Sequence, residues 1–228
     1  MRRRCVGIRL YYVHARRISQ RVSLSDTIQI VLQKRIDRIR NVVENRQENL
    51  IVVLEDVHDP HNASAILRTC DALGIHNVWF AFETEQRYNP GKIGKASSSS
   101  ANKWLDFAVF DSSASCIEAL KQQGYSIVVT ALTDASVSLM EYRAGNGKIA
   151  VVVGNEHRGV SDAMLAASDT VLQIPMFGFV QSLNVSVATA IVLWEITRQR
   201  RQQGTECLIP EEKKGKLLAD LLERGKGK

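Results

Sequence analysis

The chain has 228 residues, of which 45% are hydrophobic and 24% are charged, with a formal net charge of +6. This size allows one well-developed core with appended terminal segments, and no apolar run reaches the roughly 20 residues that a membrane-spanning helix needs. The four cysteines lie far apart without a CxxC pair, which excludes a zinc-ribbon or disulfide framework and fits the reducing cytoplasm.

The charge is unevenly distributed. Residues 1–25 carry seven arginines and no acid, residues 26–197 carry 14 basic and 19 acidic side chains (net −5), and residues 198–228 carry nine basic and five acidic. Basic ends on a mildly acidic body suit a polyanionic partner such as a nucleic acid, although a solvated basic tail has the same composition. The first 25 residues also resemble an organellar transit peptide, so a transit peptide, an RNA-binding arm and a misassigned start all stay open.

Apolar residues at helical spacing predict a helix over residues 27–47. Ser25 or Asp26 is expected to cap it, with Lys34, Arg38 and Arg46 on its exposed face. The apolar run Leu50–Leu54 is typical of a strand buried on both faces of a parallel sheet.

The pattern then alternates between strands and helices. Helices are predicted at 62–73, 114–123 and 162–167, and strands at 78–82, 126–130, 149–153 and 170–174. Residues 83–103 form a long polar loop, and the apolar first half of a helix at 183–200 is expected to be buried. An amphipathic helix is predicted at 211–222. This order predicts a three-layer α/β domain with a mainly parallel sheet. The expected divisions are a basic extension (1–25), a helix (26–48), the domain (49–203) and a helical tail (204–228).

Three polar turns follow predicted strands, where ligands bind in open α/β sheets. In the first, Asn62 and Arg68 lie near a helix N-terminus, which attracts phosphate. The alternative is that Asn62 only caps the helix and Arg68 pairs with a surface acid. His58 and His61 form an HxxH pair, but no third ligand cluster accompanies them, so no metal site is expected.

The second and third turns follow the strands at 149–153 and 170–174. Gly154 lets the backbone approach a ligand closely, and Glu156 can bind a ribose or hold another loop. In the third turn Ser182 is a natural N-cap. Asn184 and Ser186 enter an apolar helix, where buried polar side chains need hydrogen bonds within the protein or to a ligand.

These three turns resemble motifs 1, 2 and 3 of the SpoU (TrmH) family of SPOUT RNA 2′-O-methyltransferases. The matching segments are Asn62…Arg68-Thr-Cys-Asp-Ala-Leu-Gly74, Val153-Gly-Asn-Glu-His-Arg-Gly159 and Ile174-Pro-Met…Val180-Gln-Ser-Leu-Asn-Val-Ser-Val187. The resemblance extends over residues 27–201. The sequences Arg-Gln-Glu-Asn-Leu before the first strand and Glu195…Arg198-Gln-Arg200 after the third motif favour the tRNA guanosine-2′-O-methyltransferase type.

The resemblance implies a SPOUT domain with a C-terminal trefoil knot, and a homodimer with active sites at the subunit interface. S-adenosylmethionine would be held largely by backbone around Leu132, Gly154, Ile174, Met176 and Leu183. Arg68 would be the catalytic arginine, supported by Asn62, Glu156, Ser182 and Asn184. The expected substrate is tRNA, methylated on the ribose of the D-loop guanosine 18.

The implied reaction is an in-line attack of a ribose 2′-oxygen on the cofactor methyl group. A guanidinium, whose pKa lies far above neutral pH, is a poor general base. We therefore expect Arg68 to act electrostatically on a nucleotide phosphate and the developing alkoxide.

Two alternatives remain from the sequence. The same motifs permit a methyltransferase acting on ribosomal RNA or another tRNA position, but residues 1–48 are too short for a separate RNA-binding domain, which favours tRNA. A non-catalytic RNA-binding factor would be expected to have a damaged motif, and all five catalytic positions are intact. The arginine-rich start and the serine run 97–100 depart from the family pattern and put substrate choice in doubt.

Overall fold

In a computed structural model, the chain is described over residues 24–93, 101–204 and 206–226. It divides into two compact units, residues 1–36 and 37–228. The described part of the first unit is the beginning of helix α1 (Leu24–Asn45), on which Ile30, Val31 and Leu32 are exposed. Most of the arginine-rich start and the serine run 97–100 lie outside the described residues.

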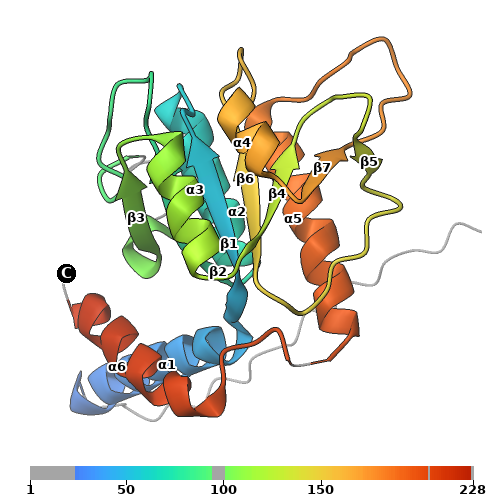
Figure 1. Cartoon of the computed structure of the whole chain (residues 1–228). Coiled ribbons are helices and arrows are strands. Elements are labelled where there is room, and N and C mark those ends of the chain that lie inside the picture. The colour runs from blue at the N-terminus through green and yellow to red at the C-terminus, as the bar shows by residue number, and fades with distance from the viewer. Residues whose placement is uncertain (1–23, 94–100, 205, 227–228) are drawn as a thin grey trace, which may run out of the picture. The chain divides into compact units, whose positions relative to one another are not determined.

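The described residues of the second unit form one parallel sheet of seven strands, in the order β3-β2-β1-β6-β4-β7-β5 (Figure 1). Strand β1 lies near its centre and pairs with β2 and β6. Residues 50–55 of β1 are all buried, which explains its continuous apolar run. The strands are β1 (Gln47–Glu55), β2 (Ile75–Ala81), β3 (Asp106–Phe110), β4 (Ser126–Thr130), β5 (Val137–Ser138), β6 (Ile149–Val153) and β7 (Thr170–Gln173).

Helices cover both faces of the sheet, which confirms the predicted three-layer arrangement (Figure 1). Alternate residues of β1 point to opposite sides. Leu50, Val52 and Leu54 pack with α2 (Pro60–Ala72) and α5 (Val185–Gln202). Ile51 and Val53 pack with α3 (Ser113–Gln122) and α4 (Asp162–Ala167).

The C-terminal helix α6 (Glu211–Lys226) confirms the predicted amphipathic segment. Its Leu221 is buried in a small cluster with Ile39 and Val43 of α1, and Trp104 of the 3₁₀ helix η1 (Ala101–Trp104) packs against that cluster. The apolar stripes of α1 and α6 therefore form a satellite core beside the sheet.

The remaining predicted helices and strands are confirmed, with their ends shifted by a few residues. Strands β3 and β5 and helix η1 were not predicted. Strand β3 is an edge strand whose residues are half-buried or exposed, and its apolar run Phe107–Phe110 is only four residues long. Strand β5 has two residues, too few for a periodic pattern.

The prediction for Arg46 was wrong. Helix α1 ends at Asn45, and the Arg46 side chain is buried instead of lying on the exposed face. Its Nη2 donates to Asp71 Oδ1 (2.7 Å) and to the carbonyl oxygen of Trp104 (3.1 Å). The helical pattern does not extend to Arg46, because the chain leaves α1 at Asn45 and enters β1 at Gln47. The Arg46 guanidinium therefore links the start of β1 to α2 and η1.

We predict that Arg46→Ala lowers the free energy of unfolding by about 2–4 kcal/mol, because it leaves a cavity and removes the donor of several hydrogen bonds. Urea denaturation measures the change. Arg40→Ala is the control, since Arg40 contacts Asp37 through an exposed ion pair, and should cost less than about 0.5 kcal/mol. Equal losses for the two variants would contradict the structural role of Arg46.

Candidate functional site

Glu156 joins the turns that follow β6 and β1. These two strands are neighbours in the sheet, so their carboxyl ends meet. Glu156 Oε2 accepts from the backbone N–H of His58 (2.9 Å). Its Oε1 accepts from the N–H of Asp59 (3.2 Å) and from Asn62 Nδ2 (2.8 Å). One carboxylate of the second motif thus fixes the entry to α2 in the first motif.

Asn62 extends this connection to the third motif. Asn184 Nδ2 donates to Asn62 Oδ1 (3.0 Å), while Asn184 Oδ1 accepts from the N–H of Ser186 (2.8 Å) at the start of α5. The three polar turns selected from the sequence are therefore joined by the side-chain series Glu156, Asn62 and Asn184. We call this series the motif relay.

Around the relay, the structure excludes one alternative and shows that two local predictions were wrong. Asp59, and not Asn62, caps α2, because its side chain accepts from His61 N–H (2.8 Å). Asn184, and not Ser182, caps α5, because the chain stays extended for two residues longer than the pattern indicated. Asn184 is exposed instead of buried, because it lies at the helix entrance.

The relay carboxylate is held in its charged form. Partial burial pushes the pKa of Glu156 upward, but hydrogen bonds from Asn62 and from the backbone of His58 and Asp59 outweigh it and keep this pKa below its usual range. Glu156 therefore acts as an acceptor at neutral pH, matching the donors that surround it.

A cavity of about 230 Å³ lies at the carboxyl ends of β4, β6 and β7. All five positions expected to contact a cofactor line it: Leu132, Gly154, Ile174, Met176 and Leu183. Glu156 and Ser182 also line it, so the relay reaches its wall. Much of the lining comes from loops rather than from helices or strands, as expected for a ligand held largely by backbone.

Gly154 is required for the shape of this cavity. Asn155 and Gly159 exchange two backbone hydrogen bonds of 2.9 Å, which fold the loop after β6 back on itself. A Cβ at Gly154 would lie 2.2 Å from the carbonyl carbon of Gly159. Only glycine fits this close approach of two backbone segments.

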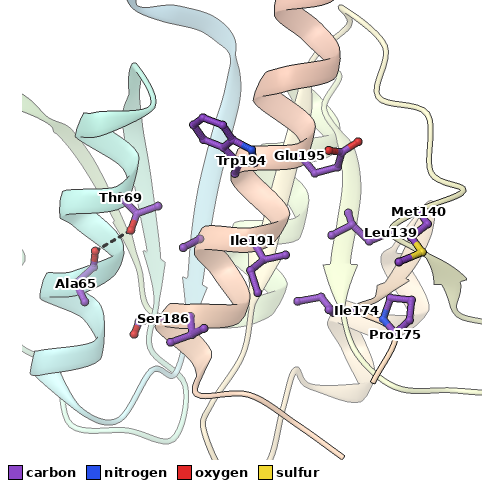
Figure 2. A pocket seen from close by; sticks show the side chains of 12 residues that line it. Ala65, Thr69, Leu139, Met140, Ile174, Pro175, Ser186, Ile191, Trp194 and Glu195 are labelled. Carbon is purple, nitrogen blue, oxygen red and sulfur yellow. Dashed lines mark hydrogen bonds between the residues drawn. The ribbon is translucent and has the colours of Figure 1, made fainter. Parts of the chain in front are cut away.

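The structure of a single chain does not bring Arg68 to the cavity. Arg68 is exposed on α2, and it is not among the described residues that line the cavity. Its neighbours Ala65 and Thr69 instead line a larger apolar groove of about 880 Å³ between α2, α5 and the segments around Met140 and Pro175 (Figure 2).

The predicted burial of the first half of α5 was wrong for the isolated chain. Thr189 faces the core, but Val187 is 48% and Ile191 is 38% exposed. Figure 2 shows Ile191 and Trp194 of α5 in the groove. The apolar residues around the helix thus form two faces, of which the sheet covers one.

A second hydrogen-bond network lies at the rim of the site, and the sequence did not predict most of it. It contains Asp56, Glu85, Asn155 and Arg158, which connect the turns after β1, β2 and β6. Asp56 and Asn155 lie inside the selected turns, so the sequence offered this much indication that they belong to the site. Glu85 lies in the polar loop without any motif, so no sequence pattern pointed to it.

The two histidines of the HxxH pair have different hydrogen-bond partners in the structure. His58 Nδ1 contacts Glu85 Oε2 (2.6 Å), whereas the backbone of His61 is bound by Asp59. Among the described residues, no group of three or more His, Cys, Asp or Glu side chains is arranged to hold a metal ion. None of the described helices is long and apolar enough to cross a membrane.

The fold and the three joined motifs define a class of protein. The sequence profile of the SpoU rRNA Methylase family matches residues 49–194, which is more than half of the chain. The chain therefore belongs to the SpoU methylase family, and the resemblance of the three motifs is confirmed.

Individual relatives agree. The chain is 39% identical over 175 residues to the tRNA (guanosine(18)-2′-O)-methyltransferase of Aquifex aeolicus (strain VF5), covering 77% of this chain and 81% of that protein. It is similar to the crystal structure of the A. aeolicus TrmH/SpoU tRNA modifying enzyme, with a TM-score of 0.77, 36% identity and coverage of 87% and 100%. It also resembles the SpoU methyltransferase AviRb from Streptomyces viridochromogenes in complex with the cofactor AdoMet (S-adenosylmethionine), with a TM-score of 0.59, 26% identity and coverage of 72% and 65%.

We predict that Gly154→Ala weakens S-adenosylmethionine binding by at least about tenfold, because the added methyl group must push the loop of residues 154–159 out of shape. Isothermal titration calorimetry measures the dissociation constant. Gly147→Ala is the matched control, because a Cβ there meets no atom within 4 Å. If both variants bind the cofactor like the parent chain, this loop does not shape the cofactor site.

Proposed function

We propose that this chain is an S-adenosylmethionine-dependent tRNA 2′-O-methyltransferase that methylates the ribose of guanosine 18 in the D-loop. The observation that carries the proposal is the motif relay beside a cavity lined by all five expected cofactor positions. The tRNA and the nucleotide position are taken from the relatives named above. Residues 49–203 would form the catalytic domain, with its C-terminal part threaded as a trefoil knot, and the protein would work in the cytoplasm.

The cavity fits the proposed cofactor. Its loop-rich lining and the glycine at position 154 suit a ligand recognised through backbone atoms. S-adenosylmethionine supplies an electrophilic methyl group when bound. Leu132, Ile174, Met176 and Leu183 would enclose the ligand, and Gly154 would let the loop after β6 approach it.

The relay residues have a positioning role in this proposal. Glu156 holds the entry of α2, Asn62 transmits that position to Asn184, and Asn184 fixes the start of α5. Ser182, on the cavity wall, would contact the reacting ribose or the cofactor. Holding the 2′-oxygen and the methyl group in near-attack geometry supplies a large share of the rate acceleration in reactions of this kind.

Arg68 is the proposed catalytic arginine. A guanidinium is a poor general base, so Arg68 would stabilise a nucleotide phosphate and the developing 2′-alkoxide, while that phosphate would assist removal of the hydroxyl proton. The neighbours Ala65 and Thr69 line the apolar groove and not the cavity. We infer that Arg68 joins the reaction at the boundary between two copies of the chain.

A homodimer formed through the groove is supported by its chemistry. The groove is large and mainly apolar, and Val187, Ile191, Trp194 and Met140 expose apolar surface on it. Contiguous exposed apolar surface of this kind marks protein interfaces. A second copy would cover the outer face of α5.

We predict that the purified full chain transfers labelled methyl from S-adenosylmethionine to unmodified tRNA transcripts. Nucleoside mass spectrometry should find 2′-O-methylguanosine in tRNA, and a transcript with another base at position 18 should gain none. Methylation of ribosomal RNA alone would replace the tRNA assignment. Cofactor binding without transfer to any RNA would favour a non-catalytic RNA-binding factor.

Arg68→Lys should lower kcat by about a hundredfold or more with cofactor binding retained, because an ammonium cannot reproduce bidentate guanidinium contacts.

We predict that Ile191→Asp combined with Trp194→Asp converts a dimer to a monomer and abolishes methyl transfer, because two charges would be buried in an apolar interface. Light scattering coupled to size-exclusion chromatography measures the mass. Val109→Asp is the control, since Val109 is an exposed apolar residue on edge strand β3, outside the groove. A parent chain that is monomeric at assay concentrations would refute the dimer.

A further inference from the structure

We propose that Glu85 is a positioning residue for methyl transfer, which acts through His58, Asn155 and Arg158 to fix the carboxylate of Glu156. The inference rests on the proposed function, because it assigns a role within the same site. Glu85 lies in the turn after β2, outside the three motifs, and its side chain is 16% exposed.

The Glu85 carboxylate binds both segments that carry the relay. Its Oε2 contacts His58 Nδ1 (2.6 Å) in the turn after β1. Its Oε1 accepts from Arg158 Nη2 (2.7 Å) and Asn155 Nδ2 (3.2 Å) in the turn after β6. The carboxylate therefore connects three turns of the sheet at one point.

These contacts surround Glu156. Asn155 precedes Glu156 in the chain and Arg158 follows two residues later, so Glu85 holds the Glu156 turn from both sides. On the opposite segment, His58 also donates its backbone N–H to Glu156 (2.9 Å). Glu85 thus fixes the donor and the acceptor of the same hydrogen bond without touching either atom.

The turn that carries Glu85 is itself held in place. Asp56 has φ +49°, in the left-handed region that aspartate tolerates better than most residues. Its carboxylate accepts from the backbone N–H groups of Glu83 (2.8 Å), Thr84 (3.0 Å) and Glu85 (3.1 Å). Its carbonyl oxygen accepts from Asn155 Nδ2 (2.8 Å). Glu85 is therefore presented on a rigid turn, as a positioning residue requires.

The His58 contact depends on pH. Glu85, by its hydrogen bond and its charge, raises the pKa of His58 above the ordinary value, and Glu156 and Asp59 act in the same direction. The His157 ring lies 6.5 Å away between centroids, and Arg158 binds the other oxygen of Glu85. Both members of the pair of His58 and Glu85 are charged when the pH is below the raised pKa of His58 and above the pKa of Glu85. The charged pair is lost as the pH rises through the raised pKa of His58.

The test compares Glu85→Gln and Glu85→Ala with the parent enzyme on tRNA. We expect Glu85→Ala to lower kcat by about tenfold to a hundredfold, with KM for tRNA near the parent value, because a small displacement of positioned groups affects the chemical step. Glu85→Gln keeps the shape but loses the charge. The His58 titration, followed by NMR of its ring protons, should move to lower pH in this variant, and any matching break in the kcat profile should move with it.

Arg87→Ala is the matched control. Arg87 lies two residues from Glu85 and forms an exposed ion pair with Asp111, so its removal should leave kcat and the His58 titration unchanged. Two results would overturn the inference: parental kcat in Glu85→Ala, or a loss of kcat fully explained by the fraction of unfolded protein. A parent chain that methylates no RNA would instead overturn the proposed function, and the NMR titration would still report whether Glu85 holds His58.

Discussion

The arrangement of the site depends on one carboxylate that bridges two adjacent strands. Strands β1 and β6 pair in the middle of the sheet, so the turns that leave their carboxyl ends are forced together with several backbone N–H groups facing the gap. Glu156 accepts from two of these groups and from Asn62, and so provides an acceptor for donors that would otherwise need water. Because Asn62 then binds Asn184, hydrogen bonds link this one carboxylate to the first turns of both α2 and α5.

The sheet and the loops at its carboxyl edge are held in shape by different interactions. The central strands are buried on both faces, so they offer a fixed base with few alternative packings. The cavity at their carboxyl ends is shaped by backbone, most clearly where Gly154 meets Gly159. Charged side chains enter at the rim, where Glu85 and Arg158 connect neighbouring turns. Side-chain identity therefore matters most where the loops are held together, and backbone shape matters most where the ligand would lie.

The sequence predicted the parts of the molecule that have a local cause. Buried strands such as β1 and β6 appear as short apolar runs, and the three polar turns stand out because they follow such runs. Contacts between distant segments produce no periodic pattern in the sequence, which is why the buried position of Arg46 and the contacts of Glu85 were not predicted. The prediction for the outward face of α5 failed for another reason, because the sequence of an apolar helix surface does not show whether the sheet covers it. The roles of Arg68 and Ser182 rest on the family resemblance, because spacing alone could not assign them.

The placement of β1 has a consequence for how the chain folds during synthesis. Strand β1 is made early, yet one of its two neighbours, β6, follows about a hundred residues later, with Leu50 opposite Ile149. Gln47, at the start of β1, also donates its side-chain amide to Thr197 of α5, still nearer the C-terminus. Until those segments leave the ribosome, one edge of β1, whose residues 50–54 are all apolar, has no partner, and such edges recruit other chains. The topology that builds the site in the finished protein thus leaves one apolar strand edge unpaired in the nascent chain until β6 has been made.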